Sequence, residues 1–190
     1  MELAYKLLSV EEFLDSCPND QRHYQLIDGV IVAMAPPAIP HQIIAANLTA
    51  EIVPAVRQNR PGCSTRSQAG IAPQGLSGRN HFETDITVTC ERGGYRGIAA
   101  EPVLIVEIQS PSTERDDHFV KLPHYQSLPS LQEILYVESE RVAATLYRRG
   151  GEGWATIDLG GGQARLQLTS IGLDIELAAL YRGVPGLAAG

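Results

Sequence analysis

The stretch Glu101-Pro-Val-Leu-Ile-Val-Glu107-Ile-Gln-Ser-Pro-Ser-Thr113 gives the strongest indication of the fold. Its apolar run from Val103 to Val106 is typical of a buried strand, and the run meets an acid at Glu107. Ser-Pro-Ser-Thr then ends the strand, and a helical pattern that carries Lys121 follows. A carboxylate at the end of a buried strand is costly unless a metal, a partner charge or a substrate compensates for it. We therefore expect other segments to bring such a partner to Glu107.

The hydrophobic pattern on both sides of this stretch predicts a mixed α/β domain with a central sheet and two main helices. Ser9-Val-Glu-Glu12 is a capping box that starts a short helix. Two β-prone runs flank Asp28-Gly29, which predicts a hairpin. The first main helix should start at Pro40 and end or kink near Pro54. Further strands are expected over 84–90, 103–109, 133–137 and 164–168, a hairpin over 141–159, and a terminal helix over 174–181.

The second main helix is expected over about 116–127. Its inner side would carry Phe119, Leu122 and Leu128, and Pro123 should disturb its middle. We expect one domain over residues 1–190, with its core over about 9–181 and a frayed tail over 186–190.

Composition limits the class of protein. Hydrophobic residues make up 44% and charged residues 19% of the 190 residues, an ordinary globular profile. No apolar run approaches the roughly 20 residues that cross a bilayer, and no signal peptide is expected at the N-terminus. Cys17, Cys63 and Cys90 form no CxxC pair, so neither a zinc site nor a disulfide framework is expected. The simplest location is a reducing cytoplasm.

The net charge of −7 argues against broad, sequence-independent binding to nucleic acid, which depends on many phosphate contacts. A local basic cleft remains compatible with this charge. For any single basic residue, a scattered and solvated position is the favoured interpretation. The candidates for a basic face are Arg57, Arg60, Arg66, Arg79, Arg115 and Lys121.

Asp85 and Glu107 lie at the ends of two expected central strands. If these strands are neighbours, the two carboxylates converge at one edge of the sheet, and a divalent cation relieves their repulsion. Oxygen ligands favour Mg²⁺ or Mn²⁺ over zinc. The alternative is that both are ordinary acids near strand ends. Lys121 either points to the same edge or forms a surface pair with Asp117, four residues before it.

Taken together, these segments resemble the Uma2 family of restriction-endonuclease-like proteins (DUF820), which is part of the PD-(D/E)XK nuclease superfamily. The resemblance runs from about residue 9 to 150 and implies a mixed central sheet flanked by helices, an N-terminal hairpin, a metal site on one sheet edge and DNA as substrate. It is carried by Tyr24-Gln-Leu-Ile-Asp-Gly29, Thr84-Asp85, Val106-Glu107-Ile-Gln-Ser-Pro-Ser-Thr113, Asp117-x3-Lys121-Leu122-x2-Tyr125 and Pro129-Ser-Leu-Gln-Glu133.

The resemblance also implies roles for single residues. Asp85 and Glu107 match the acids that bind Mg²⁺, with the backbone carbonyl of Ile108 as a further ligand. Gln109 stands where the superfamily has lysine, and Lys121 would supply the missing amine from the following helix. The same comparison makes Gln25 a neutral ligand where the family has glutamate. His41 matches a recurrent family histidine that could contact the site or a phosphate, or could cap its helix.

These observations favour a Mg²⁺-dependent DNA endonuclease that acts as a homodimer, because two-fold related sites are the simplest way to cut both strands. The alternative is a nuclease-fold module that has lost catalysis, as Gln25 and Gln109 suggest, and binds nucleic acid or a protein. A third interpretation is an α/β domain with buried polar residues and no site.

Overall fold

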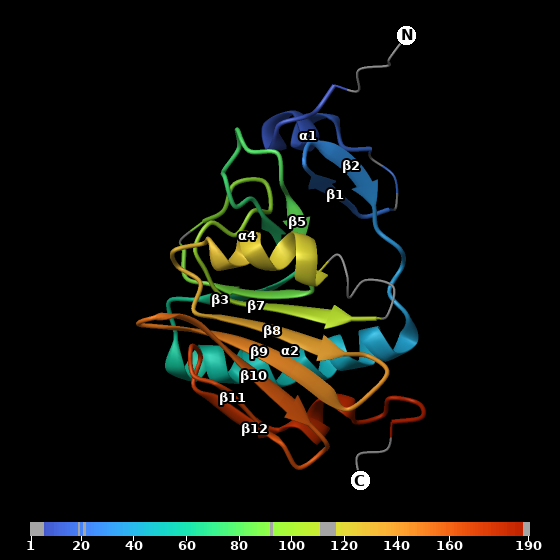
Figure 1. The fold of residues 1–190 in the computed structure, drawn as a ribbon, viewed down its shortest axis with the longest axis vertical. Helices are drawn as coiled ribbons and strands as arrows, with labels where there is room; N and C mark the ends of the chain where they lie inside the picture. Colours follow the sequence, from blue (N-terminus) through green and yellow to red (C-terminus); the bar gives the residue numbers. More distant parts are fainter. Residues whose placement is uncertain (1–5, 19, 21, 92, 111–116, 188–190) are drawn as a thin grey trace.

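The computed structural model describes residues 6–18, 20, 22–91, 93–110 and 117–187 (Figure 1). At its centre is a six-stranded mixed sheet with the strand order β10-β9-β8-β7-β6-β3. Neighbouring strands run antiparallel except β7 and β8, which are parallel. The sheet consists of β3 (Ser64–Ser67), β6 (Ile86–Thr89), β7 (Pro102–Gln109), β8 (Glu133–Glu138), β9 (Ala143–Gly150) and β10 (Gly153–Gly160).

Strand β7 is the stretch quoted at the start, and all eight of its residues are buried. A strand covered on both faces has a nearly continuous apolar sequence, which is why Val103 to Val106 carried such a clear signal. The expected α/β fold, with a mixed central sheet flanked by helices, is confirmed.

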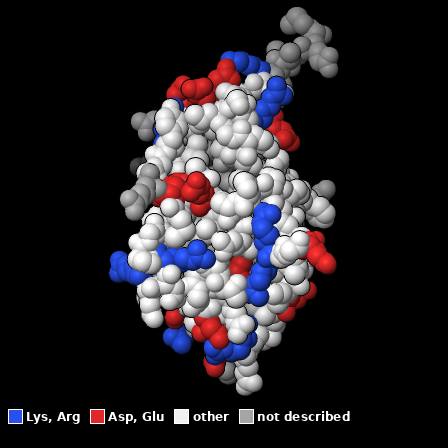
Figure 2. Space-filling view, turned by 90° about the vertical axis from the view of Figure 1, so that its left-hand side faces the viewer, with Lys and Arg blue, Asp and Glu red and all other residues white. Residues whose placement is uncertain are grey.

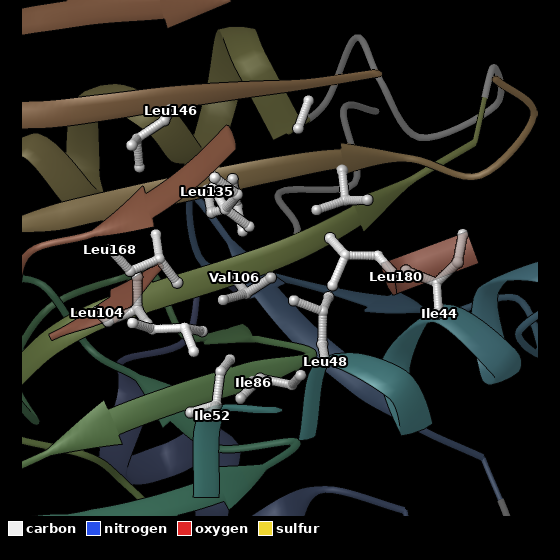
Figure 3. Close-up of a cluster of buried hydrophobic side chains, with 14 of the residues drawn as sticks. Ile44, Leu48, Ile52, Ile86, Leu104, Val106, Leu135, Leu146, Leu168 and Leu180 are labelled. Carbon is white, nitrogen blue, oxygen red and sulfur yellow. The ribbon is translucent and has the colours of Figure 1, made fainter. Parts of the chain in front are cut away.

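Helix α2 (Ile39–Asn59) covers one face of the sheet. Ile44, Leu48 and Ile52 recur along its buried side and pack with Ile86 and Val106 of the sheet (Figure 3). The helix continues through Pro54, so the prediction of an end there is wrong. Proline removes one N–H from the helical ladder, but Val56 continues the buried stripe beyond it. Packing against the sheet therefore carries the helix past Pro54.

The opposite face is covered by the π-helix η1 (Asp117–Lys121), by α4 (Leu122–Gln126), and by β4 (Gly70–Ile71) with β5 (Phe82–Glu83). The helical segment changes from π to α geometry immediately before Pro123, so the expected disturbance is present. The prediction that Phe119 points inwards is wrong, because its side chain is 78% exposed. The wider turn of a π-helix shifts the phase of the residues after it. Tyr125, which is fully buried, takes the inner position.

The N-terminal elements follow the sequence signals closely. Helix α1 (Val10–Ser16) has the capping box, with Ser9 and Glu12 bonded reciprocally. Strands β1 (Tyr24–Ile27) and β2 (Val30–Ala33) form the expected hairpin. Asp28 and Gly29 both have positive φ, 49° and 85°, as a two-residue hairpin turn of this type requires.

The C-terminal segment differs from its prediction. Residues 173–176 form strand β12 (Leu173–Glu176), which pairs with β11 (Arg165–Leu168), and only Leu177–Tyr181 is helical, as the 3-10 helix η2. Leu177 and Leu180 do point inwards and join the cluster under α2. The apolar residues in this segment fit two patterns. Those before Leu177 alternate as in a strand, and Leu177 and Leu180 lie on the inner side of the short helix. The tail from 188 to 190 lies outside the described residues.

Cys63 and Cys90 form a disulfide, which corrects the expectation that no such bond is present. They directly flank the Ser64↔Thr89 pair of β3 and β6, and their Cα atoms lie 3.9 Å apart. The pairing of these strands brings together two residues that are 27 apart in sequence, and no local spacing rule signals this. Cys17 is a free thiol.

Among the helices in the described ranges, none is both long and apolar enough to cross a membrane.

His81 is a buried histidine in the loop before β5, 8% exposed, with its ring centroid 5.2 Å from that of Phe13. Gly70 must be a glycine, because a Cβ there would lie 2.2 Å from the His81 ring. The Nδ1 atom of His81 is buried and has no hydrogen-bond partner in the described part of the chain. Burial lowers the pKa of His81 below its usual 6.5.

We expect His81 to make the folded state less stable at mildly acidic pH. The unfolded chain takes up a proton near pH 6.5, whereas folded His81 resists it, so stability is full above that pH and falls as the pH drops towards the folded-state pKa. Urea unfolding of wild type and His81→Gln between pH 7.5 and 5 measures this contribution. Wild type should lose more stability than the variant, and parallel pH profiles would contradict the assignment.

Candidate functional site

Asp85 and Glu107 face each other across β6 and β7. Ile86 pairs with Val106 in the antiparallel register, so the preceding residue, Asp85, lies opposite Glu107. Side chains alternate between the faces of a sheet, and Ile86 and Val106 belong to the cluster under α2. Both acids therefore lie on the opposite face, beneath η1 and α4. The sequence placed Asp85 and Glu107 at one edge of the sheet, and the structure brings them together there.

Glu107 is buried with a cationic and a phenolic partner. Lys121 Nζ lies 3.2 Å from Glu107 Oε1, and the Tyr125 hydroxyl donates to the same oxygen at 2.6 Å. Glu107 and Lys121 are each 4% exposed, so the ion pair is shielded from solvent. Two such buried charges are compatible with a fold only when each compensates the other. Lys121 thus points into the site and not along the surface, which the sequence had left open.

Tyr125 is a site residue that sequence reasoning did not assign. It follows Lys121 by four residues, and residues four apart lie on one face of a helix. That spacing was available in the sequence and would have placed the Tyr125 hydroxyl beside the same carboxylate.

Asp85 is held by a backbone amide and a histidine. The N–H of Ile108 donates to Asp85 Oδ2 at 2.7 Å, and His41 Nε2 lies 3.0 Å from Oδ1. His41 stands in the first turn of α2, directly after Pro40. Its contact with Asp85 orients the carboxylate, a function that hydrogen-bonded neighbours often serve for metal-binding acids.

The two glutamines each bury a polar atom that has no hydrogen-bond partner among the described residues. These atoms are Gln25 Oε1 and Gln109 Nε2. Gln109 is 2% exposed and shares a face of β7 with Glu107. Gln25 shares a face of β1 with Ile27, which packs against the same cluster as Tyr125. Buried polar groups without partners are uncommon in native proteins, and both lie on the side of the molecule that carries Glu107.

Glu83 and His23 form a further side-chain contact two residues before Asp85, and neither residue was assigned from the sequence. His23 Nδ1 lies 2.8 Å from Glu83 Oε1, and the Glu83 side chain is 15% exposed. Burial raises the pKa of Glu83, while the contact with His23 lowers it. The charges of Asp85 and Lys121 also act on the Glu83 carboxyl. The sequence offered one indication of Glu83, namely its position two residues before Asp85.

The donor atoms on this face are oxygens of the kind that Mg²⁺ and Mn²⁺ prefer. The Gln109 carbonyl accepts a bond from Ser139 on the β8 side, so the Ile108 carbonyl, one residue earlier, points towards β6 and Asp85. In the described ranges, no three His, Cys, Asp or Glu side chains are close enough to hold a metal by themselves. The residues fit an ion that takes two carboxylates, an amide and a carbonyl oxygen, with water for the rest.

The candidates for a basic face do not gather into one patch on the face that Figure 2 shows. Arg66 is engaged by Glu91 at 2.9 Å and by the backbone carbonyls of Gly93 and Ile98, so its guanidinium holds a loop in place. Figure 2 shows basic and acidic side chains interspersed over one face, with no single basic patch. Arg115 and the Pro111-Ser-Thr113 segment lie in the part of the chain that the structure does not describe.

Comparison with known proteins agrees with this architecture. A protein of Synechocystis sp., the uncharacterised slr1290, is 29% identical over 180 residues, which is 93% of each chain. A crystal structure from Anabaena variabilis, described as a "putative nuclease belonging to DUF820", has the same fold with a TM-score of 0.74 at 17% identity, over 92% of this chain and 98% of that one. The model of the Uma2 family, described as "Putative restriction endonuclease", matches residues 10–179. The chain therefore belongs to the Uma2 family of restriction-endonuclease-like proteins.

Proposed function

We propose that this protein is a Mg²⁺- or Mn²⁺-dependent endonuclease that hydrolyses phosphodiester bonds in DNA. One observation carries the proposal. Asp85 lies opposite Glu107 on one face of the sheet, and the buried Lys121 bonds to Glu107. A structural domain gains little from burying Glu107 and Lys121 beside a second acid, because hydrophobic residues of similar volume are often at least as stabilising. Such a cluster is typical of sites where charge does chemical work.

Each residue has a defined part in the proposed reaction. Asp85, Glu107, the Ile108 carbonyl and Gln25 Oε1 would hold the ion, which when bound polarises the scissile phosphate and lowers the pKa of a water molecule. His41 and the Ile108 N–H keep the Asp85 carboxylate in place. Lys121 is a donor that can bond to phosphate oxygens, and so is Gln109 Nε2, which has no partner among the described residues.

The second candidate is a nuclease-fold module that binds nucleic acid or a protein without cutting. The observation that favours it is the neutral pair Gln25 and Gln109, which leaves the site with fewer charges than the family and superfamily patterns provide. Fewer anionic ligands weaken the binding of a hard cation.

Calorimetric titration of Mn²⁺ and Mg²⁺ into wild type and Asp85→Ala separates the two functions. We expect wild type to bind Mn²⁺ at millimolar or lower concentration and Asp85→Ala to lose that binding. Glu152→Ala, in the exposed turn between β9 and β10, is the control, because it also removes one carboxylate. Absence of binding by wild type at millimolar Mn²⁺ would support the inactive module.

We also propose that the active form is a homodimer, since two copies of one site can cut both strands of a duplex. In the same proposal the chain works as a single domain in the cytoplasm, where its DNA substrate would be found.

A further inference from the structure

A pocket of about 490 Å³ lies at the outer edge of the central sheet, beside its last strand, β3. Its volume falls in the range of about 300–1,000 Å³ that is usual for sites of small ligands. The proposed reaction does not use it. The residues that line the pocket are Arg66, Ser67, Gln68, Ala69, Gly94 and Gly97.

The pocket is one strand away from Asp85, a proposed metal ligand. The backbone N–H of Gln68 donates to the Asp85 carbonyl at 3.3 Å, so these two residues lie opposite each other. Arg66 pairs with Thr87, two residues after Asp85, and side chains alternate between the faces of a sheet. Arg66 therefore lies on the face that carries Asp85 and Glu107. Because neighbouring strands are only about 4.7–4.9 Å apart, a nucleotide joined to a phosphate at Asp85 can reach the pocket.

Arg66 forms a fixed wall of this pocket. Its guanidinium lies 2.9 Å from Glu91 and bonds to the carbonyls of Gly93 and Ile98. Gly94 allows this close packing, since a Cβ there would lie 2.9 Å from Arg66 Nη1. The guanidinium is thus held in one orientation, and Glu91 compensates its charge. This favours a neutral, planar ligand over a phosphate, because guanidinium planes stack on nucleobases.

Gln68 supplies the polar groups for such a ligand. Its side chain is exposed, and its φ of 53° is uncommon for a residue other than glycine. Residues held in such conformations are concentrated where proteins contact ligands. The side-chain amide has both a donor and an acceptor, and glutamine uses this pair to bond to the edge of adenine.

We propose that this pocket holds one nucleobase of the DNA strand that is cut, from a nucleotide next to the scissile phosphate. The base stacks on the Arg66 guanidinium and bonds at its edge to the Gln68 amide. A base enters such a pocket only when it leaves the base stack, so the substrate strand is unpaired at this position. The proposal rests on the proposed function and adds to it a site for the base.

Fluorescence anisotropy of fluorescein-labelled oligo(dA) tests the proposal beside an abasic strand of the same length. Ca²⁺ replaces Mg²⁺ as the oxygen-bound ion, and gel electrophoresis checks that the DNA stays intact. We expect wild type to bind oligo(dA) roughly tenfold more tightly than the abasic strand, the order of affinity that stacking of one base contributes. Gln68→Gly should lose most of this preference, because glycine accepts the positive φ and removes the amide.

Two further variants serve as controls. Gln68→Asn keeps an amide and tolerates the positive φ, so it should retain more of the preference than Gln68→Gly. Gln58→Ala removes an exposed amide from α2, on the other face of the sheet, and should bind both strands as wild type does. Mn²⁺ binding, measured by calorimetry, should be unchanged in all three variants, since neither glutamine is a proposed ligand. The thermal midpoint of each variant shows whether it is folded.

The outcomes separate this proposal from the proposed function. Loss of the preference for oligo(dA) in Gln68→Gly, with wild-type affinity for the abasic strand and partial retention in Gln68→Asn, would support it. No preference for oligo(dA) in wild type, an unchanged preference in Gln68→Gly, or equal losses in the two Gln68 variants would overturn it, as would a loss in Gln68→Gly that is equal for the two strands. Normal Mn²⁺ binding in these cases leaves the metal site standing. Failure of wild type to bind Mn²⁺ and both strands would overturn the proposed function and this proposal together.

Discussion

Replacing Glu107 with glutamine is expected to reduce Mg²⁺-dependent nicking of supercoiled plasmid by roughly 100-fold or more, which is the usual cost of losing one preorganised charge-stabilising group. Glutamine has the shape of glutamate, and its amide oxygen can still accept the hydrogen bond from the Tyr125 hydroxyl. It brings no negative charge to the ion. The substitution also removes one charged partner of the buried Lys121, so a loss of stability accompanies the loss of activity.

The double variant Glu107→Gln with Lys121→Met separates these two effects. It removes both buried charges, so we expect stability to return towards wild type while nicking stays at least as low as in Glu107→Gln. Glu152→Gln, in an exposed turn, is the control for the general loss of one negative charge. Nicking by Glu107→Gln at the wild-type rate would indicate a contaminating nuclease, and activity that follows stability across all variants would contradict a catalytic part for Glu107.

The central part of the site was predictable because its signals are local. The apolar run of β7 places Glu107 at a sheet edge, and Asp85 stands where the neighbouring strand begins. Lys121 follows in the next helical segment, and each of these three positions needs only hydrophobic periodicity and the order of elements. The resemblance to the Uma2 family then indicated that the strands are neighbours, which periodicity alone does not establish.

The parts that could not be predicted depend on contacts between distant segments. The His23–Glu83 pair requires the N-terminal hairpin to lie beside β5, and the Cys63–Cys90 bond requires β3 to pair with β6. Neither arrangement follows from the spacing of residues along the chain. The passage of α2 through Pro54 has the same origin, because burial against the sheet outweighs a local rule about proline.

The phase of the segment around Lys121 shows why side-chain direction was harder to predict than the presence of a helix. A regular α-helix over 116–127 would have turned Phe119 inwards, whereas the π-helix turns Lys121 and Tyr125 towards Glu107. Single turns of π-helix are frequent at functional sites. Here the irregular turn coincides with the residue that the proposed mechanism needs as a donor.

Replacing Glu133 with alanine is expected to lower the free energy of unfolding by about 3–5 kcal/mol, the usual cost of removing one partner of a buried ion pair. Glu133 begins β8 and is fully buried. Its Oε1 lies 2.7 Å from Arg148 Nε on β9, and its Oε2 accepts the N–H of Ser170 at 2.9 Å in the turn between β11 and β12. Thr169 donates to Oε1 from both its backbone and its hydroxyl.

Urea unfolding of Glu133→Ala beside Glu138→Ala measures this effect on one strand. Glu138 pairs with Arg141 at 2.8 Å, but the Arg141 side chain is 71% exposed, so its loss should cost less than about 1 kcal/mol. Equal losses in the two variants would contradict a structural part for the Glu133 network. Mn²⁺ binding by folded Glu133→Ala should remain at the wild-type level, because Glu133 bonds to Arg148 and to the turn between β11 and β12, a different set of partners from those of Glu107. The two buried acids of neighbouring parallel strands would then differ in their roles. Glu133 ties β8 to β9 and to the C-terminal hairpin, whereas Glu107 bonds to Lys121 and Tyr125 and would hold the ion in the proposed function.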